Sequence, residues 1–214
     1  MNQDSMEPPG RLSIPPRQNP LATAHQKAVA ALADQAEAQL RWLGADPAGS
    51  QWRLPVLAGV FLVETSTGSV CSEDGKKVQP TWQILALHYL AIRARPPDYP
   101  PEVTFASLHG GKVYAGVYEQ RVNRRLCAGV GKDLHRLQGA AAVLGAHPVE
   151  GGDGAFEVMA FPRIPIRLIW YAGDAELAPS CTLLLPRNID SFLCTEDIVV
   201  LSESFVSRLS GKPF

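Results

Sequence analysis

The segment TWQILALHYLAIRA, residues 81–94, constrains the fold most because large apolar side chains surround the helix that it predicts. A helix that is apolar all round has to be enclosed by other elements. Thr81 can cap its start, and Pro96 and Pro97 end it. We therefore expect one central, largely buried helix, and the remaining segments must supply the surfaces that cover it.

The chain as a whole is predicted to consist of a short N-terminal arm followed by one domain. Residues 1–20 hold five prolines and few large apolar groups, which predicts a disordered N-terminal arm. Residues 21–214 are expected to form a single domain, which is the usual outcome for this length. No apolar run resembles a secretory signal or reaches the length of a membrane span, so we expect a cytoplasmic protein with no membrane partner.

Helical and β patterns follow one another without strict βαβ alternation, which predicts an α+β fold with a mixed or antiparallel sheet. Apolar residues at helical spacing predict amphipathic helices over residues 21–43, 116–127, 131–145 and 195–209. Short apolar runs between turn residues predict strands over 54–64, 69–72, 155–161, 166–171 and 181–185.

The charge balance excludes a strongly basic nucleic-acid binder, because 20 Lys and Arg stand against 21 Asp and Glu. A locally basic stretch runs from Lys112 to Arg136, and acidic residues outnumber basic ones from Glu150 onward. A solvated helix face is the usual cause of such a stretch. An acidic partner or an anionic ligand stays open as the alternative.

An acidic loop and one histidine are the first candidate functional groups. Asp174 and Glu176 follow an apolar strand two residues apart, so they can share a proton or a cation, although Gly173-Asp174 is also ordinary turn chemistry. His88 lies inside the most apolar helix, where a neutral imidazole needs a partner. It is a candidate metal ligand or a core residue bonded to a carbonyl or carboxylate group.

A glycine turn and a stiff arginine are the next candidates. His109, Gly110, Gly111 and Lys112 allow close approach of an anion to the backbone, with a hairpin turn as the alternative, and neither phosphate-loop pattern is present. Arg163 stands in a proline-rich turn and can hold a carboxylate, most simply as a structural ion pair. Its candidate partners are Asp153, Asp174, Glu196 and Asp197.

The four cysteines form no recognisable pattern. Cys71, Cys127, Cys181 and Cys194 lie far apart and include no CxxC pair. Cys194 precedes a predicted helix start, where a thiol pKa can be lowered. We expect reduced, buried and inert thiols.

Several segments in the same order resemble the DUF3786 family of uncharacterised bacterial proteins, found largely in anaerobes. They are Leu87-His88-Tyr89-Leu90, Gly110-Gly111 with Tyr114, Pro162-Arg163-Ile164-Pro165, Trp170 with Gly173-Asp174 and Glu176, and Glu196-Asp197. The resemblance covers roughly residues 50–210. The chain departs from the family pattern at Ala175, Leu177 and Leu185-Pro186, which weakens the case for an acidic metal site. The resemblance implies no established activity and no cofactor.

Two functions follow as hypotheses. The first is a binding or accessory protein for a small anionic or cofactor-type ligand in anaerobic metabolism, with either a small molecule or a protein as partner. Its candidate ligand-binding residues are His109, Gly110, Gly111, Lys112, Tyr114, Arg163, Trp170, Asp174 and Glu176. The alternative is an enzyme that uses Asp174 and Glu176 with His88 or His109 as acid, base or metal ligands. Convergence of these side chains in one cleft would favour a ligand or catalytic site, and scatter would favour partner binding.

Overall fold

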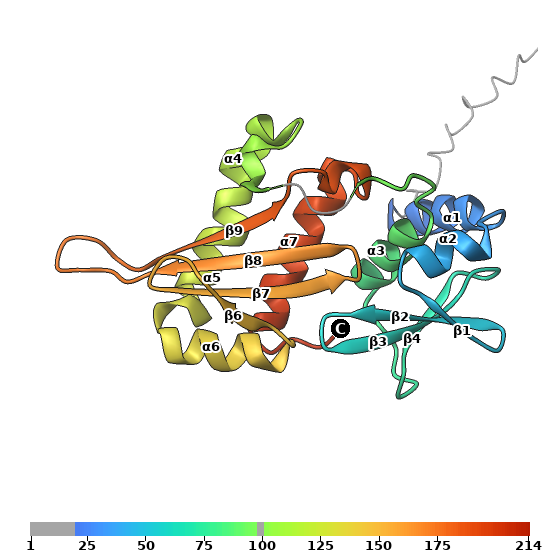
Figure 1. Cartoon of the computed structure of the whole chain (residues 1–214), viewed down its shortest axis with the longest axis horizontal. Helices are drawn as coiled ribbons and strands as arrows, with labels where there is room; N and C mark the ends of the chain where they lie inside the picture. Colours follow the sequence, from blue (N-terminus) through green and yellow to red (C-terminus); the bar gives the residue numbers. More distant parts are fainter. Residues whose placement is uncertain (1–19, 98–100) are drawn as a thin grey trace, which may run out of the picture.

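The computed structural model describes residues 20–97 and 101–214 as an α+β fold with two antiparallel sheets (Figure 1). The predicted fold class is therefore confirmed. The N-terminal arm that we expected lies, up to residue 19, outside the described residues. Among the residues that the structure describes, no helix is long and apolar enough to cross a membrane.

The smaller sheet has four strands in sequence order. They are β1 (Asp46–Ala48), β2 (Gln51–Val56), β3 (Gly59–Glu64) and β4 (Ser69–Ser72). The single strand that we expected over residues 54–64 is wrong: β2 and β3 form a hairpin, with Val56 opposite Gly59. Leu57 lies in the turn of this hairpin and has a φ of 52°, and its N–H donates to Ala160 O at 3.3 Å. This bond ties the hairpin to the other sheet, so a tertiary contact supports a turn with weak local signals.

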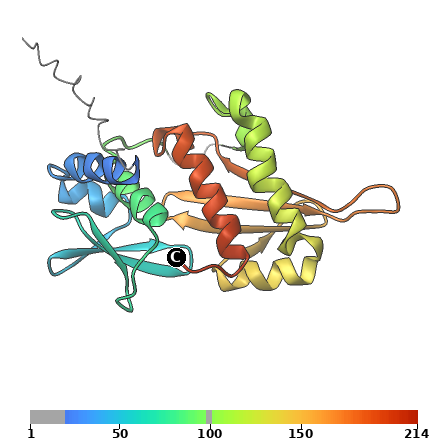
Figure 2. The ribbon, with the colours of Figure 1, turned by 180° about the vertical axis from the view of Figure 1, so that it is seen from behind.

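The larger sheet has five strands in the order β5-β9-β8-β7-β6, each pair antiparallel. They are β5 (Glu102–Thr104), β6 (His147–Val149), β7 (Gly154–Phe161), β8 (Ile164–Tyr171) and β9 (Ser180–Pro186). Figure 2 shows helices over one of its faces. Residues such as Val158, Leu168 and Leu183 are buried, whereas their strand neighbours Glu157 and Arg167 are half-buried. This alternation is the pattern of a sheet covered on one side.

Seven α-helices are described. They are α1 (Pro20–Leu32), α2 (Glu37–Trp42), α3 (Pro80–Leu90), α4 (Gly111–Tyr118), α5 (Arg124–Ala128), α6 (Leu134–Val143) and α7 (Thr195–Leu209). The helix predicted over residues 21–43 is interrupted between α1 and α2. The helix predicted over 116–127 starts earlier, at Gly111, and a π-helical turn (Glu119–Asn123) joins α4 to α5.

The central position predicted for residues 81–94 is confirmed in α3, which ends at Leu90 rather than Ala94. Tyr89 is fully buried, stacks on Phe161 of β7 at 4.6 Å between ring centroids, and donates its hydroxyl to Leu43 O at 2.7 Å. Trp82 meets Phe61 of β3 edge-on at 6.4 Å. Trp82 also lies 6.5 Å from Phe161 between ring centroids, so α3 contacts both sheets.

The glycine pair at the start of α4 has a structural cause. Gly110 has a φ of 74°, a conformation that favours glycine, and it precedes the helix. A Cβ on Gly111 would lie 2.0 Å from the carbonyl oxygen of Phe105. The alternative of a hairpin turn is wrong, because the glycines begin α4 and do not join two strands. The close approach that they allow is that of the chain's own backbone.

Gly111→Ala should lower the free energy of unfolding by about 2 kcal/mol, because the backbone must shift to relieve the overlap. Gly116→Ala is the matched control in the same helix, since a Cβ there meets nothing within 4 Å. It should raise stability by about 1 kcal/mol through helix propensity. Urea unfolding followed by circular dichroism measures both changes, and equal effects of the two substitutions would contradict this account.

Candidate functional site

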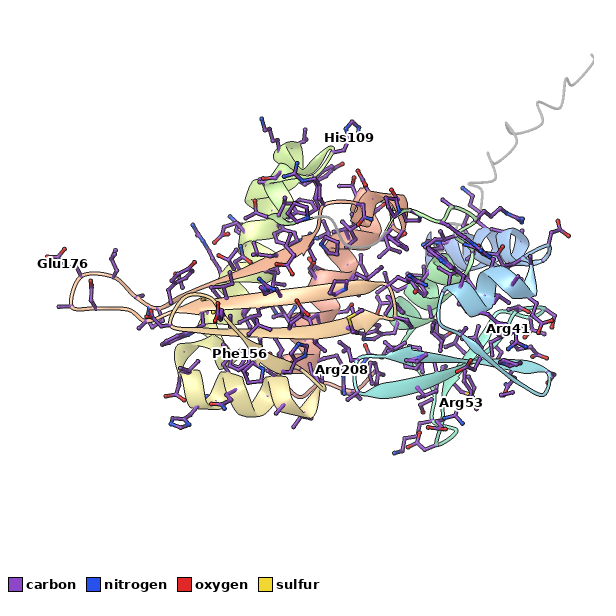
Figure 3. The ribbon with its side chains drawn as sticks, viewed as in Figure 1. Arg41, Arg53, His109, Phe156, Glu176 and Arg208 are labelled. Carbon is purple, nitrogen blue, oxygen red and sulfur yellow. The ribbon has the colours of Figure 1, made fainter. Side chains whose placement is uncertain are left out.

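The acidic loop between β8 and β9 is a self-bonded turn. Asp174 Oδ1 accepts the N–H groups of Glu176 and Leu177, both at 2.8 Å, and these bonds lower the pKa of the Asp174 carboxyl. Both carboxylates are exposed. Figure 3 shows Glu176 at the far end of this loop and His109 at another corner of the molecule. The structure does not bring these two predicted residues together.

Arg163 and Trp170 have structural contacts. Arg163 Nε donates to Trp42 O at 2.9 Å, and its guanidinium lies 4.2 Å from the centroid of the Trp42 ring. Trp170 is buried, and its Nε1 donates to Gly131 O at 2.7 Å. These two residues fasten the ends of β8 to α2 and to the segment before α6.

His88 finds its partner on α7. His88 Nδ1 and Asp197 Oδ2 are 2.8 Å apart, and both side chains are mostly buried. The hydrogen bond to Asp197 raises the pKa of His88, against the opposing effect of burial. The carboxylate fixes the imidazole ring through Nδ1, as it does for a histidine in acid–base chemistry. Among the described residues, no group of three or more His, Cys, Asp or Glu side chains could hold a metal ion.

Cys194 directly precedes α7 and lies beside this pair. Burial and the Asp197 carboxylate raise the pKa of the Cys194 thiol, although backbone N–H groups at the helix start act in the opposite direction. The lowered pKa that a helix start can produce is therefore not found. A thiol whose nearest charged neighbour is a carboxylate is a poor nucleophile.

A groove runs between α4 and α7 from this point. It encloses about 730 Å³, and we call it the α4–α7 groove. It is lined by Tyr114, Val117, Arg121, Cys194, Thr195, Glu196, Val199, Val200 and Glu203. Figure 2 shows the two helices running side by side over the sheet. The buried Tyr118 hydroxyl holds them together by donating to Ser202 Oγ at 3.0 Å.

Exposed apolar side chains continue from this groove onto the outer surface of α4. Val113 is 83% exposed, Tyr114 52% and Val117 43%. They are three of the seven exposed large apolar side chains among the described residues. His109 and Lys112 are also exposed at this end of α4, and Gly110 faces Thr195 of α7, whose Oγ1 would lie 3.4 Å from an added Cβ.

A second depression, of about 620 Å³, lies on the uncovered face of the larger sheet. There Arg167 bonds to Glu102 at 3.1 Å and to Glu157 at 3.3 Å. Burial raises the pKa of Glu102. We did not predict this cluster, although Glu157 and Arg167 stand opposite each other on adjacent strands. Arg167 bridges the two carboxylates of this cluster, and its Nε is buried with no hydrogen-bond partner among the described residues. The exposed apolar side chains beside the α4–α7 groove make that groove the stronger candidate site.

Replacing His88 with Gln should remove a pH-dependent part of the stability. The folded-state pKa lies above the ordinary value of 6.5, so this contribution is fully present below about pH 6.5 and is lost as the pH rises through the folded-state pKa. We expect a loss of about 1 kcal/mol at low pH, since the pair is partly exposed, and a smaller loss at high pH. Urea unfolding from pH 5.5 to 8.5 measures it.

His109→Gln is the matched control, because that histidine is exposed. It should change stability little at every pH. If the difference in the free energy of unfolding between wild type and His88→Gln grew with rising pH, the assignment of the His88–Asp197 bond would be wrong.

Three segments that carry the family resemblance therefore meet at the start of α7: His88 from α3, the Gly110–Tyr114 turn of helix α4, and Glu196-Asp197. No curated protein and no solved structure matches the chain. A family model described as a domain of unknown function, DUF3786, matches residues 34–208. This match covers most of the chain, including both sheets and the α4–α7 groove, and the chain belongs to the DUF3786 family.

Proposed function

We propose that this chain is a binding or accessory protein that docks a protein partner in the α4–α7 groove. The observation that carries the proposal is the group of exposed apolar side chains on α4, Val113, Tyr114 and Val117, which adjoins the groove. Apolar side chains gathered beside a groove are typical of protein-binding surfaces. A cytoplasmic location, which the sequence pattern predicts, and the anaerobic host that the resemblance implies are part of the same proposal.

The exposure of Val113 favours a macromolecule over a small ligand. Tyr114 and Val117 line the groove, but Val113 does not. A small molecule inside the groove would leave Val113 in water, whereas a segment lying along α4 would cover all three side chains. The removal of each such side chain from water contributes about 1.5 kcal/mol or more to binding.

The shape and charge of the groove indicate the kind of partner. A groove between two helices accommodates an amphipathic helix with apolar residues three or four positions apart. Two carboxylates, Glu196 and Glu203, line the groove with one basic residue, Arg121, which lies 3.5 Å from Glu203. The lining therefore has a net negative charge. This favours a partner with a basic residue over the anionic ligand that the glycine turn suggested.

The enzyme hypothesis keeps one specific observation in its favour, the His88–Asp197 pair. This pair borders a smaller depression of about 280 Å³ that includes Lys27 and Phe192. None of the residues described as lining this depression is a serine, threonine or cysteine. Asp174 lies in the exposed turn between β8 and β9, so acid–base chemistry would have to start from His88 without it.

The test begins with a photoreactive amino acid, p-benzoylphenylalanine, in place of Val113 in the native host. In a control variant, the same photoreactive amino acid replaces Val143 of α6, which is 74% exposed and far from the groove in sequence. We expect one protein to crosslink at position 113 and not at 143. That protein is then purified, and its affinity for the full chain is measured by calorimetry.

Val113→Lys with Val117→Lys should weaken this affinity at least tenfold, which corresponds to about 1.4 kcal/mol. Val143→Lys and the pair Asp174→Asn with Glu176→Gln should leave it unchanged. Unaltered affinity of the Val113 and Val117 variant would overturn the proposal. A loss of affinity on changing Asp174 and Glu176 would place the site in the acidic loop instead.

A further inference from the structure

Cys127 and Cys181 are distant in sequence but form a pair in the fold. Cys127 lies on α5 and Cys181 near the start of β9. A Cβ built on Gly131 would meet both Cys181 Sγ and the carbonyl oxygen of Leu126, the residue before Cys127, so the two cysteines lie on either side of the same glycine. Helix α5 packs on β9, which brings the two thiols together. Neither cysteine belongs to the α4–α7 groove.

The chain makes room for this pair with a glycine. A Cβ on Gly131 would lie 2.6 Å from Cys181 Sγ and 2.9 Å from Leu126 O. Trp170, which stands opposite Cys181 on β8, donates its Nε1 to Gly131 O and so holds this backbone in place. The buried thiol is therefore in a closely packed site that depends on the absence of a side chain at position 131.

The two thiols differ in exposure and acidity. Cys127 is half-buried, whereas Cys181 is buried. The neighbouring Cys181 thiol lowers the pKa of Cys127, against the effects of burial and of the Glu119 carboxylate. Contact with Cys127 and burial raise the pKa of Cys181. An accessible, more acidic thiol beside a buried one is the arrangement of an attacking and a resolving cysteine.

We propose that Cys127 and Cys181 form a reversible disulfide by exchange with a low-molecular-weight disulfide. The Cys127 thiolate attacks one sulfur of the disulfide, forms a mixed disulfide and releases one thiolate. Cys181 Sγ then attacks Cys127 Sγ, loses its proton and expels the second thiolate. The protein dithiol is oxidised, and the small disulfide is reduced to two thiols.

The other two cysteines do not take part. Cys71 lies on β4 of the smaller sheet, with its Sγ directed at Leu62 O. Cys194 lies beside Asp197 at the start of α7, and its thiol pKa is raised. These two positions serve as internal controls, because Cys71 is half-buried like Cys127 and Cys194 is exposed.

The experiment equilibrates the reduced full-length chain with mixtures of reduced and oxidised glutathione. Remaining thiols are alkylated in denaturant, and peptides are identified by mass spectrometry without reduction. We expect a Cys127–Cys181 linked peptide that increases with the oxidised fraction and disappears on adding dithiothreitol. Alkylation of Cys71 should stay unchanged, and brief alkylation of the folded protein should modify Cys127 several-fold faster than Cys71.

Two variants test the order of the steps. Cys181→Ala should accumulate glutathione on Cys127, because no resolving thiol is left, and Cys127→Ser should leave Cys181 unmodified. The wild-type peptide map needs no variant, so misfolding of either variant would not remove the test. The proposal is overturned if Cys127 and Cys181 are both still free thiols, and so become alkylated, after incubation with oxidised glutathione. It is also overturned if either cysteine forms its disulfide mainly with Cys71 or Cys194.

Discussion

The burial of α3 is the constraint on which the rest of the structure depends. Its side chains are apolar on nearly every face, so exposing any face of this helix to water would be unfavourable in free energy. Trp82 contacts Phe61 of the smaller sheet, and Tyr89 stacks on Phe161 of the larger one. Each of these aromatic side chains contributes on the order of 2 kcal/mol by leaving water. The two sheets are thus joined through one helix.

This constraint also positions the groove. His88 is the half-buried residue in an otherwise buried stretch of α3, and its bond to Asp197 fixes the start of α7 against α3. Helix α7 in turn holds α4 through the Tyr118–Ser202 bond. The α4–α7 groove is therefore anchored to the core on the α7 side, and α4 presents Val113 on its outer side.

The elements with strong local signals could be predicted from the sequence, and those decided by tertiary contacts could not. The apolar pattern of α3 predicts both its conformation and its burial. Leu57 carries no turn signal, and its positive φ is supported by a hydrogen bond to Ala160, which is far away in the sequence. Likewise, the pattern around His88 shows that it needs a partner, but only the packing of α7 on α3 identifies Asp197.

The same distinction explains the candidate sites. The glycine turn, Tyr114 and the Glu196-Asp197 pair are visible in the sequence as separate motifs, whereas their meeting requires the sheet between them. No sequence rule pairs Cys127 with Cys181, because their proximity depends on the packing of α5 on β9. The helical segment from Gly111 to Ala128 is about 27 Å long at 1.5 Å per residue. It carries the groove at one end and Cys127 at the other, so one continuous helical segment joins the binding surface to the thiol pair without placing them in one site.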